Sequence, residues 1–248
     1  MKHLRASIRF ASFVIFSFGL YLAWWVTSIF IPNKQYWRQL ALGWWSQGFV
    51  RISGMELEVI GEAPKPPFFL VANHLGYADI PALRAAATGI FVAKHDIGTW
   101  FLAGRMVRDM GNVFVNRANR RDIPRAGEEI IEKLSQGEGV IVFPEGTSTK
   151  GEDVLPFNSS FLEFAARTDL PVSYAAISYR TPPGEPTASE AVCWWDDTGF
   201  VAHMYRLFTL SRYTAVITFG EEPILAPDRK QLAEKLRAKV KERFIPVI

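Results

Sequence analysis

The longest apolar run of the chain limits its possible folds more than any other feature. Residues 10–31 carry no formal charge, and Pro32 follows them directly. A helix of about 20 apolar residues is long enough to cross the hydrocarbon of a bilayer, so the run predicts a membrane-anchoring helix. Basic residues flank the run on both sides, and the positive-inside rule therefore gives no orientation. A cleaved signal peptide is the alternative, but the run is long for one and no small-residue cleavage site follows.

The next segment, residues 33–52, predicts a second helix. Trp37, Leu40, Trp44 and, with a looser fit, Trp45 lie near one face of that helix. Such a face is typical of a helix at the membrane interface. An amphipathic helix packed on its own domain is the alternative, because aromatic stripes also occur in cores. We expect residues 1–54 to be an anchor whose two helices pair as a hairpin entering the bilayer from one side, and residues 55–248 to be the catalytic domain.

Composition agrees with membrane contact. Of the 248 residues 49% are hydrophobic and 14% aromatic, with eight tryptophans, which is rich for a soluble enzyme. The net charge of +3 favours approach to anionic lipids. The last helix has scattered Lys and Arg, a pattern of a solvated surface, and we expect no nucleic-acid partner. The single cysteine, Cys193, excludes an internal disulfide and indicates a domain facing the reducing cytosol.

After Gly54 short β-branched and aromatic runs alternate with helical stretches. This pattern predicts an α/β fold with a single mixed sheet flanked by helices. We expect strands at residues 57–60, 68–72, 90–93, 113–115, 140–143, 172–177, 192–195 and 215–219. We expect helices at residues 81–87, 123–135, 161–167 and 228–244, with further helices in most of the remaining gaps.

The polar loop after the second of these strands carries the strongest chemical signal. It contains His74 and Asp79 and leads into a helix that Asp79 and Pro81 begin. If the loop folds back, the Asp79 carboxylate meets one imidazole nitrogen and leaves the other facing a substrate, as in a general base with its orienting partner. A purely structural hydrogen bond would give the same spacing. The chain has no G-x-S-x-G nucleophile elbow, so the attacking hydroxyl would be the substrate's own.

Three motifs in order support the chemical interpretation. They are Asn73-His74 with Asp79, then Gly111-Asn-Val-Phe-Val-Asn-Arg117, then Phe143-Pro-Glu-Gly-Thr-Ser148. Together they closely resemble the glycerolipid acyltransferase family, and within it the bacterial 1-acylglycerol-3-phosphate acyltransferases, over residues 57–219. The resemblance implies that His74 is the general base with Asp79 as its partner. It also implies that Arg117 binds the phosphate of the acceptor, and that Glu145 and Gly146 belong to an acceptor-binding block.

The residue types fit these implied roles. A guanidinium such as that of Arg117 binds phosphate through paired hydrogen bonds, and Lys94 at the end of the preceding strand adds a second positive charge. Glu145, Gly146 and Thr147 follow the point where an apolar strand stops at Pro144. A turn there presents backbone amides to a phosphate and a carboxylate to a glycerol hydroxyl or to Arg117. The alternatives are a surface arginine and a plain turn capped by Thr147.

The sequence also departs from the family pattern. Asn116 stands where an Asp commonly precedes the arginine, which makes the acceptor headgroup less certain. Tyr174 stands near the place of a second proline in the fourth block, from which we carry over no functional residue. His95 and His203 have no assigned role, and neither has the ligand cluster that a metal site needs. We expect no metal and no cofactor.

The expected reaction is acyl transfer from acyl-coenzyme A or acyl carrier protein to the free hydroxyl of 1-acylglycerol-3-phosphate, giving phosphatidic acid. The alternatives are acylation of another lysolipid, such as a lyso-ornithine lipid or a lysophospholipid, and a non-catalytic lipid-binding protein. The Trp-rich segment at residues 192–200 would suit a different headgroup. The expected location is the inner membrane, with the catalytic domain on its cytoplasmic side.

Overall fold

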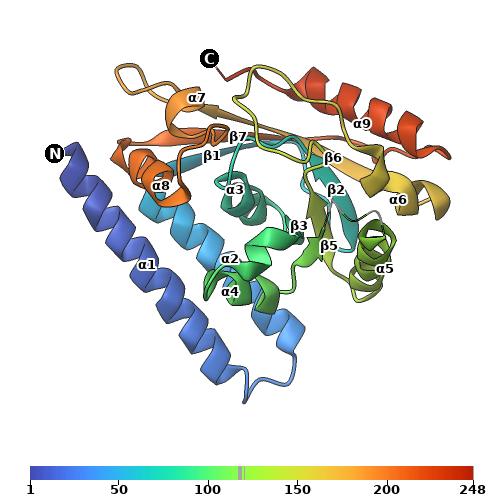
Figure 1. Cartoon of the computed structure of the whole chain (residues 1–248), viewed down its shortest axis with the longest axis horizontal. Helices are drawn as coiled ribbons and strands as arrows, with labels where there is room; N and C mark the ends of the chain where they lie inside the picture. The colour runs from blue at the N-terminus through green and yellow to red at the C-terminus, as the bar shows by residue number, and fades with distance from the viewer. Residues whose placement is uncertain (117–118, 120, 248) are drawn as a thin grey trace.

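The computed structural model describes residues 1–116, 119 and 121–247. Its centre is a seven-stranded sheet with the strand order β1-β7-β6-β2-β5-β3-β4 (Figure 1). The strands are β1 (Met55–Ile60), β2 (Phe68–Ala72), β3 (Ile90–Lys94), β4 (Val113–Val115), β5 (Gly139–Val142), β6 (Val172–Arg180) and β7 (Tyr213–Phe219).

The sheet is mixed, as the sequence predicts. All neighbouring strands run parallel except β6 and β7, which are antiparallel. Parallel strands need covered faces, and every residue of β2 and β5 is buried. The carboxyl ends of β2, β5, β3 and β4 meet along one edge of the sheet, where the polar motifs of the sequence follow.

Helices cover both faces of the sheet (Figure 1). One layer is formed by α5 (Asp122–Ser135), α6 (Glu163–Arg167) and α9 (Arg229–Arg243). The other is formed by α2 (Lys34–Ser53) and α3 (Asp79–Ala86), with α1 (Lys2–Thr27) and α8 (Phe200–Thr209) packed outside it. The shorter elements are η1 (His95–Thr99), α4 (Ala103–Asp109), η2 (Ser159–Leu162) and α7 (Ala188–Ala191).

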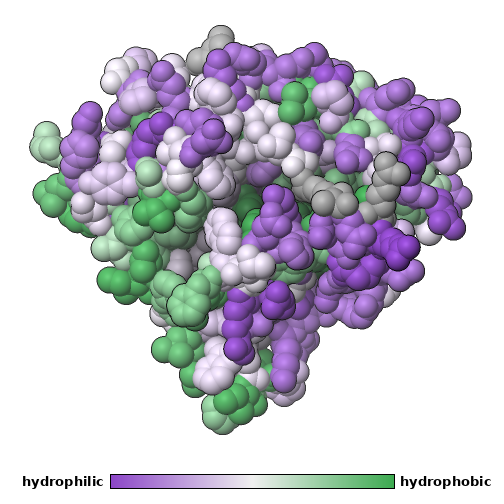
Figure 2. Space-filling view, in the orientation of Figure 1, coloured by the Kyte–Doolittle hydropathy of each residue, from purple (hydrophilic) through white to green (hydrophobic). Residues whose placement is uncertain are grey.

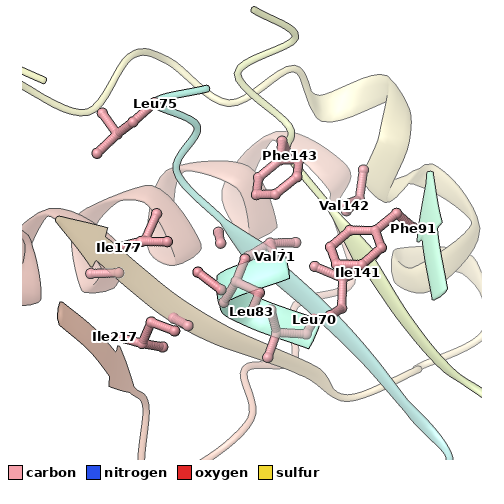
Figure 3. Packing of buried hydrophobic residues seen from close by; sticks show 14 of the residues in the cluster. Leu70, Val71, Leu75, Leu83, Phe91, Ile141, Val142, Phe143, Ile177 and Ile217 are labelled. Carbon is pink, nitrogen blue, oxygen red and sulfur yellow. The ribbon is translucent and has the colours of Figure 1, made fainter. Parts of the chain in front are cut away.

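The core lies between the sheet and these layers. Figure 3 shows Val71 of β2, Ile141 of β5 and Ile177 of β6 beside one another, with Leu83 of α3 packed over the same strands. All four side chains are fully buried. The continuous apolar runs that predict the strands are therefore the runs that fill the core.

The two N-terminal helices form the predicted hairpin (Figure 1). The Asn33 side chain caps α2 by accepting a hydrogen bond from the amide of Tyr36 at 2.9 Å, and Gly54 ends the helix with φ at +77°. The Trp45 indole donates to the hydroxyl of Ser17 on α1 at 3.0 Å. One face of α2, which includes Ala41, Leu42 and Phe49, is buried against the rest of the protein, whereas Trp44 stays half exposed. The interfacial position of the tryptophan face stays a prediction.

Polar contacts also bind α2 to the sheet domain. The side chains of Arg38 and Gln39 both donate to the carboxylate of Glu138, which precedes β5 and is buried. Arg84 of α3 donates to the Gln39 carbonyl at 2.6 Å and to its side-chain oxygen at 2.9 Å. The helix pair is thus joined to the domain by a buried ion pair as well as by apolar packing.

The four predicted helices are present as α3, α5, η2 with α6, and α9, and seven of the eight predicted strands are present. The strand predicted at residues 192–195 is wrong. Those residues follow α7, whose start is stabilised by reciprocal hydrogen bonds between Thr187 and Glu190. Val192 and Cys193 are buried by packing of this turn instead of by strand pairing.

Candidate active site

The loop that joins β2 to α3 holds the predicted catalytic residues, and we name residues 73–79 the His–Asp loop. Asn73 fixes its start by pairing with the backbone of β6. Its side-chain amide donates to the Ile177 carbonyl at 2.9 Å, and its side-chain oxygen accepts from the Ile177 amide at 2.8 Å. Asn73 thereby extends the β2–β6 pairing by one residue and directs the chain out of the sheet at the position of His74.

His74 and Asp79 meet as the sequence predicts. The distance from His74 Nδ1 to Asp79 Oδ2 is 2.7 Å. The Asp79 side chain is fully buried, whereas 22% of the His74 side chain is exposed. With its Nδ1–H donated to the carboxylate, the imidazole has Nε2 turned away from Asp79 and able to accept a proton. This is the arrangement of a general base held in one tautomer by a buried acid.

Three further donors hold the Asp79 carboxylate. Oδ2 also accepts from the backbone amides of Leu75 at 2.6 Å and Gly76 at 3.0 Å, and Oδ1 accepts from the Tyr179 hydroxyl at 2.7 Å. Burial, with a smaller contribution from the charge of Asp79, raises the pKa of Tyr179 well above its ordinary value, so this hydroxyl keeps its proton. With His74, these donors use both oxygens of a side chain that is fully buried.

The His74 ring rests on an aromatic platform. Its centroid lies 4.2 Å from that of Phe143, with the planes 13° apart, and Phe143 stacks in turn on Phe91 at 6.1 Å. Figure 3 shows Phe143 just past the end of β5 and Phe91 on the neighbouring strand β3. The hydrogen bond to Asp79 alone leaves the imidazole free to rotate about the line between the two bonded atoms. Stacking on Phe143 restricts that rotation.

The third motif folds beside the His–Asp loop. Glu145 accepts the amide of His74 on Oε2 at 3.4 Å and the amide of Leu155 on Oε1 at 3.2 Å. Burial raises the pKa of Glu145 to about 8, although both hydrogen bonds oppose the shift. The Thr149 amide donates to the His74 carbonyl at 3.0 Å, so this motif supports the backbone on both sides of the histidine.

The predicted phosphate cradle forms a tight turn after β5, and its binding of phosphate stays a prediction. Gly146 adopts φ +80°, and its amide donates to the Phe143 carbonyl at 3.2 Å, inside the turn. Thr147 is exposed, and its hydroxyl lies 3.4 Å from the Ser148 carbonyl. Both residues therefore belong to the turn whose neighbours Phe143 and Glu145 contact His74.

The cationic side of the site lies at the ends of β3 and β4. Lys94 is exposed and forms an ion pair with Asp96 at 2.5 Å. Arg117 lies outside the described residues. A polar pocket of about 350 Å³ opens near the ends of these two strands, and its lining residues are His95, Arg108, Phe114, Asn116, Asn119, Asp122 and Arg125.

One acidic group anchors this pocket. Asp122 accepts the Asn116 amide at 2.6 Å and pairs with Arg125 at 2.6 Å, and the Arg125 pair lowers the pKa of the carboxyl. Arg108 stacks over the Phe114 ring at 5.5 Å. Neither Arg108 nor Arg125 stands out in the sequence, because neighbouring arginines crowd that stretch and spacing alone does not separate them.

The Trp-rich segment, residues 192–200, is hydrogen-bonded to the His–Asp loop. The Trp194 amide donates to the Leu75 carbonyl at 2.8 Å, and the Trp194 carbonyl accepts the hydroxyl of Ser148. This backbone contact joins the first and third motifs. The segment thus braces the loop beside His74, a role that its tryptophan content did not predict.

His203 also joins the Trp-rich segment to the His–Asp loop. It is fully buried on α8, its Nδ1 lies 2.9 Å from the Tyr77 hydroxyl and its Nε2 lies 2.9 Å from the Cys193 carbonyl. Burial lowers the pKa of His203 to about 4, so the ring is neutral at pH 7, accepting from Tyr77 and donating to Cys193. Among the described residues no group of three or more His, Cys, Asp or Glu side chains is arranged to hold a metal ion.

Comparison with known proteins places this geometry in a family. The sequence profile described as "Acyltransferase" matches residues 54–178. A lyso-ornithine lipid O-acyltransferase of Pseudomonas aeruginosa is 32% identical over 246 residues, which cover 97% of this chain and 94% of that protein. A 1-acyl-sn-glycerol-3-phosphate acyltransferase of Neisseria gonorrhoeae is 29% identical over 206 residues, covering 82% and 78%.

A solved structure has the same fold. The crystal structure of the 1-acyl-sn-glycerophosphate (LPA) acyltransferase PlsC from Thermotoga maritima matches with a TM-score of 0.69 at 23% identity, over 98% of this chain and 97% of that one. The fold and the sequence matches confirm the resemblance that the three ordered motifs carry. The chain therefore belongs to the acyltransferase family.

Proposed function

We propose that this protein transfers a fatty acyl group from a thioester donor to the free hydroxyl of a lysolipid, with His74 as general base. The observation that carries the proposal is the 2.7 Å contact between His74 Nδ1 and the fully buried Asp79. It supports an imidazole whose Nε2 accepts a proton from a substrate hydroxyl.

In the proposed reaction, Nε2 of His74 takes the hydroxyl proton as the oxygen attacks the thioester carbonyl. The tetrahedral intermediate then collapses and the carbon–sulfur bond breaks. The imidazolium returns its proton to the leaving thiolate, so the products are an ester and a free thiol. Asp79 stabilises the transient imidazolium and holds the ring in position. The donor is acyl-coenzyme A or acyl carrier protein, since both carry a thioester on a soluble carrier.

Our first candidate for the acceptor is 1-acylglycerol-3-phosphate, which would give phosphatidic acid. Lys94, Arg117 and the arginines of the polar pocket are the proposed phosphate-binding groups, because guanidinium and ammonium groups bind phosphate strongly. Glu145, Gly146 and Thr147 are the proposed neighbours of the glycerol. Glu145 also has a supporting role, since its carboxylate binds the backbone of His74.

The second candidate is a lyso-ornithine lipid. The relative from P. aeruginosa, named for that acceptor, aligns with 97% of this chain, and Asn116 replaces the aspartate that commonly precedes the arginine. A non-catalytic lipid-binding protein would not need the four hydrogen bonds that hold Asp79 ready beside His74. We therefore favour an enzyme over a binding protein.

We also propose that the protein binds the inner membrane from its cytoplasmic side. Helix α1 is long and apolar enough to cross a bilayer, and 11% of its most apolar window is buried within the protein. Figure 2 shows apolar residues gathered on the side where α1 and α8 lie and at the tip of the helix pair. An anchored enzyme meets a lipid acceptor in the bilayer and a soluble donor from the cytosol.

The decisive experiment measures acyl transfer by the purified protein in detergent. Radiolabelled oleoyl-coenzyme A is offered with 1-oleoylglycerol-3-phosphate or with lyso-ornithine lipid. We expect His74→Ala to reduce transfer about a hundred- to ten-thousand-fold while folding normally by circular dichroism. His3→Ala, the same change at an exposed histidine, is the matched control. Transfer to neither lysolipid by the wild type, or full activity in His74→Ala, would refute the proposal.

A further inference from the structure

An open apolar groove lies between α1 and α8, outside the site described above. Its volume is about 730 Å³, within the range of lipid-sized ligand sites. The lining residues are Phe10 from α1 and Gly199, Phe200, Val201, Ala202 and Tyr205 at or next to the N-terminal half of α8. The side chains are apolar apart from the Tyr205 hydroxyl, which lies 3.3 Å from both the His3 carbonyl and the Ser7 hydroxyl. The groove therefore suits a hydrocarbon chain and not a polar ligand.

One wall of the groove touches the His–Asp loop. The Phe200 ring meets the Tyr77 ring edge to face, with centroids 4.9 Å apart, and Tyr77 lies between His74 and Asp79 in the sequence. Trp194 and Trp100 also contact Phe200, at 5.8 and 5.6 Å. A chain lying in the groove would thus reach the catalytic loop through a continuous aromatic wall.

The opposite wall belongs to α1, which exposes apolar side chains along its length. They include Leu4, Ile8, Ile15, Phe18, Leu22 and Trp25, spaced by three, four or seven residues and so on one flank of the helix. Figure 2 shows this apolar flank continuing up to the region of α8. If α1 lies in the bilayer, the groove opens beside the lipid and a chain can enter it without crossing water.

Resting on the proposed function, we infer that this groove binds the hydrocarbon tail of the lysolipid acceptor. The acceptor tail starts in the bilayer that faces α1, whereas the donor arrives from the aqueous phase on a soluble carrier. Phe10 of α1 lines the groove on one side, and Phe200 in its other wall contacts Tyr77 of the His–Asp loop. A lysolipid whose tail occupies the groove has its headgroup and free hydroxyl at the sheet edge where His74 and the cationic groups lie.

The test fills the groove with a larger side chain and varies the length of the acceptor's tail. Ala202→Trp places an indole in the groove, and Ala238→Trp makes the same change on an exposed surface of α9. Acceptors with one headgroup and either a hexanoyl or an oleoyl tail are compared in mixed micelles. We expect Ala202→Trp to raise the ratio of KM for the oleoyl acceptor to KM for the hexanoyl acceptor about tenfold, the effect of losing contacts to a few methylenes. Ala238→Trp should leave the ratio as in the wild type.

The donor chain is varied in parallel, with octanoyl- and oleoyl-coenzyme A. A change in donor preference with an unchanged acceptor ratio would overturn the inference and assign the groove to the donor. An unchanged ratio in both series would overturn it as well. Activity of the wild type on the hexanoyl acceptor tests the proposed function separately, because that substrate needs little of the groove.

A second measurement keeps the inference testable if Ala202→Trp does not fold. A lysolipid with a diazirine near the end of its tail is irradiated with the wild-type protein, and the labelled peptides are identified by mass spectrometry. We expect labelling at Phe10 and within residues 199–205, reduced in competition with unlabelled lysolipid. Specific labelling confined to other segments would refute the assignment.

Discussion

Asp79 accepts four hydrogen bonds, and the one from Tyr179 comes from a residue 100 positions away in the sequence. Burying a carboxylate costs free energy unless its oxygens accept hydrogen bonds, and here both oxygens do. The backbone donors come from the His–Asp loop itself, whereas Tyr179 reaches it from β6. The tyrosine therefore fixes the acid against the sheet, and the acid fixes the histidine.

Tyr179→Phe should lower kcat about tenfold or more and leave KM for both substrates within about twofold. The substitution keeps the ring and removes one hydrogen bond to a charged group, a loss of about 1.5–3 kcal/mol. Steady-state kinetics at saturating donor measure the effect. Tyr213→Phe is the matched control, because it removes another buried tyrosine hydroxyl, which bonds Ser53 at 3.0 Å instead of Asp79. Equal kcat losses in both variants would contradict a specific role of Tyr179.

Glu145 should make the folded protein less stable as the pH rises. Its pKa is raised from 4.5 to about 8 in the folded protein, so between these values the folded state binds more protons than the unfolded state. The free energy of unfolding then falls with rising pH by up to about 1.4 kcal/mol per unit. Urea titrations from pH 5 to pH 8 should show this slope in the wild type and a flatter one in Glu145→Gln. Parallel slopes in the two proteins would exclude Glu145 as its source.

The sequence predicts the residues that act within one motif better than those that act across the fold. His74 and Asp79 are five positions apart, so loop geometry alone brings them together. Tyr179 contacts Asp79, and Phe143 contacts His74, only because β6 and β5 flank β2. This order of strands in the sheet cannot be seen in any local sequence pattern. His203 reads as an isolated histidine until α8 is placed against the His–Asp loop.

At the scale of elements, the buried ion pair between α2 and the sheet domain joins segments 100 residues apart. Arg38 and Gln39 share the Glu138 carboxylate, whose side chain is 1% exposed, and Arg84 holds Gln39 in place from α3. Breaking a buried ion pair lowers stability, because the remaining charge is left without its partner and without water to solvate it. Helix α2 is therefore joined firmly to the helices and strands of the sheet domain.

Arg38→Met should destabilise the protein by about 3–5 kcal/mol, because it leaves Glu138 buried with a neutral amide as its remaining side-chain donor. Chemical denaturation monitored by tryptophan fluorescence would measure the change. Arg51→Met, at an exposed position of the same helix, should cost less than about 0.5 kcal/mol. A loss of similar size in both variants would mean that the ion pair adds nothing to stability.

Strands form where the sequence predicts them when both of their faces are buried. The runs 68–72 and 140–143 are apolar throughout, and they form the fully buried strands β2 and β5. The run 192–195 is also apolar throughout and forms no strand. Its burial comes from the turn after α7 and from contact with Leu75, and hydrophobicity alone cannot distinguish that burial from strand pairing.

At the scale of the whole molecule, α1 has one side on the protein and one side free. Its protein-facing side includes the buried Ala6 and Ser17, and Arg9 donates to the carbonyls of Leu210 and Ser211 just beyond α8 at 2.7 and 3.1 Å. Its free side carries the apolar flank described above. The protein and the lipid would thus share one helix, and the active site would be held at a fixed height above the bilayer.

Ile15→Glu combined with Leu22→Glu should weaken binding to vesicles of phosphatidylethanolamine and phosphatidylglycerol about tenfold or more, since both side chains are exposed on the apolar flank that we propose contacts lipid. Co-flotation with the vesicles measures binding. Ile131→Glu with Leu225→Glu, two exposed apolar residues outside α1, should bind like the wild type. Unchanged binding of the α1 variant would show that this flank does not contact lipid.

The packing of α1 on α8 also has a consequence for how the chain is made. The ribosome releases α1 about 170 residues before α8, which at roughly 5–20 residues per second means a delay of about ten seconds or more. During that interval α1 can pair with α2 but lacks its other partner within the protein, α8. The membrane can receive it in the meantime, so nascent chains arrested near residue 150 should already sediment with membranes, and the bilayer would act as the first folding partner of this enzyme.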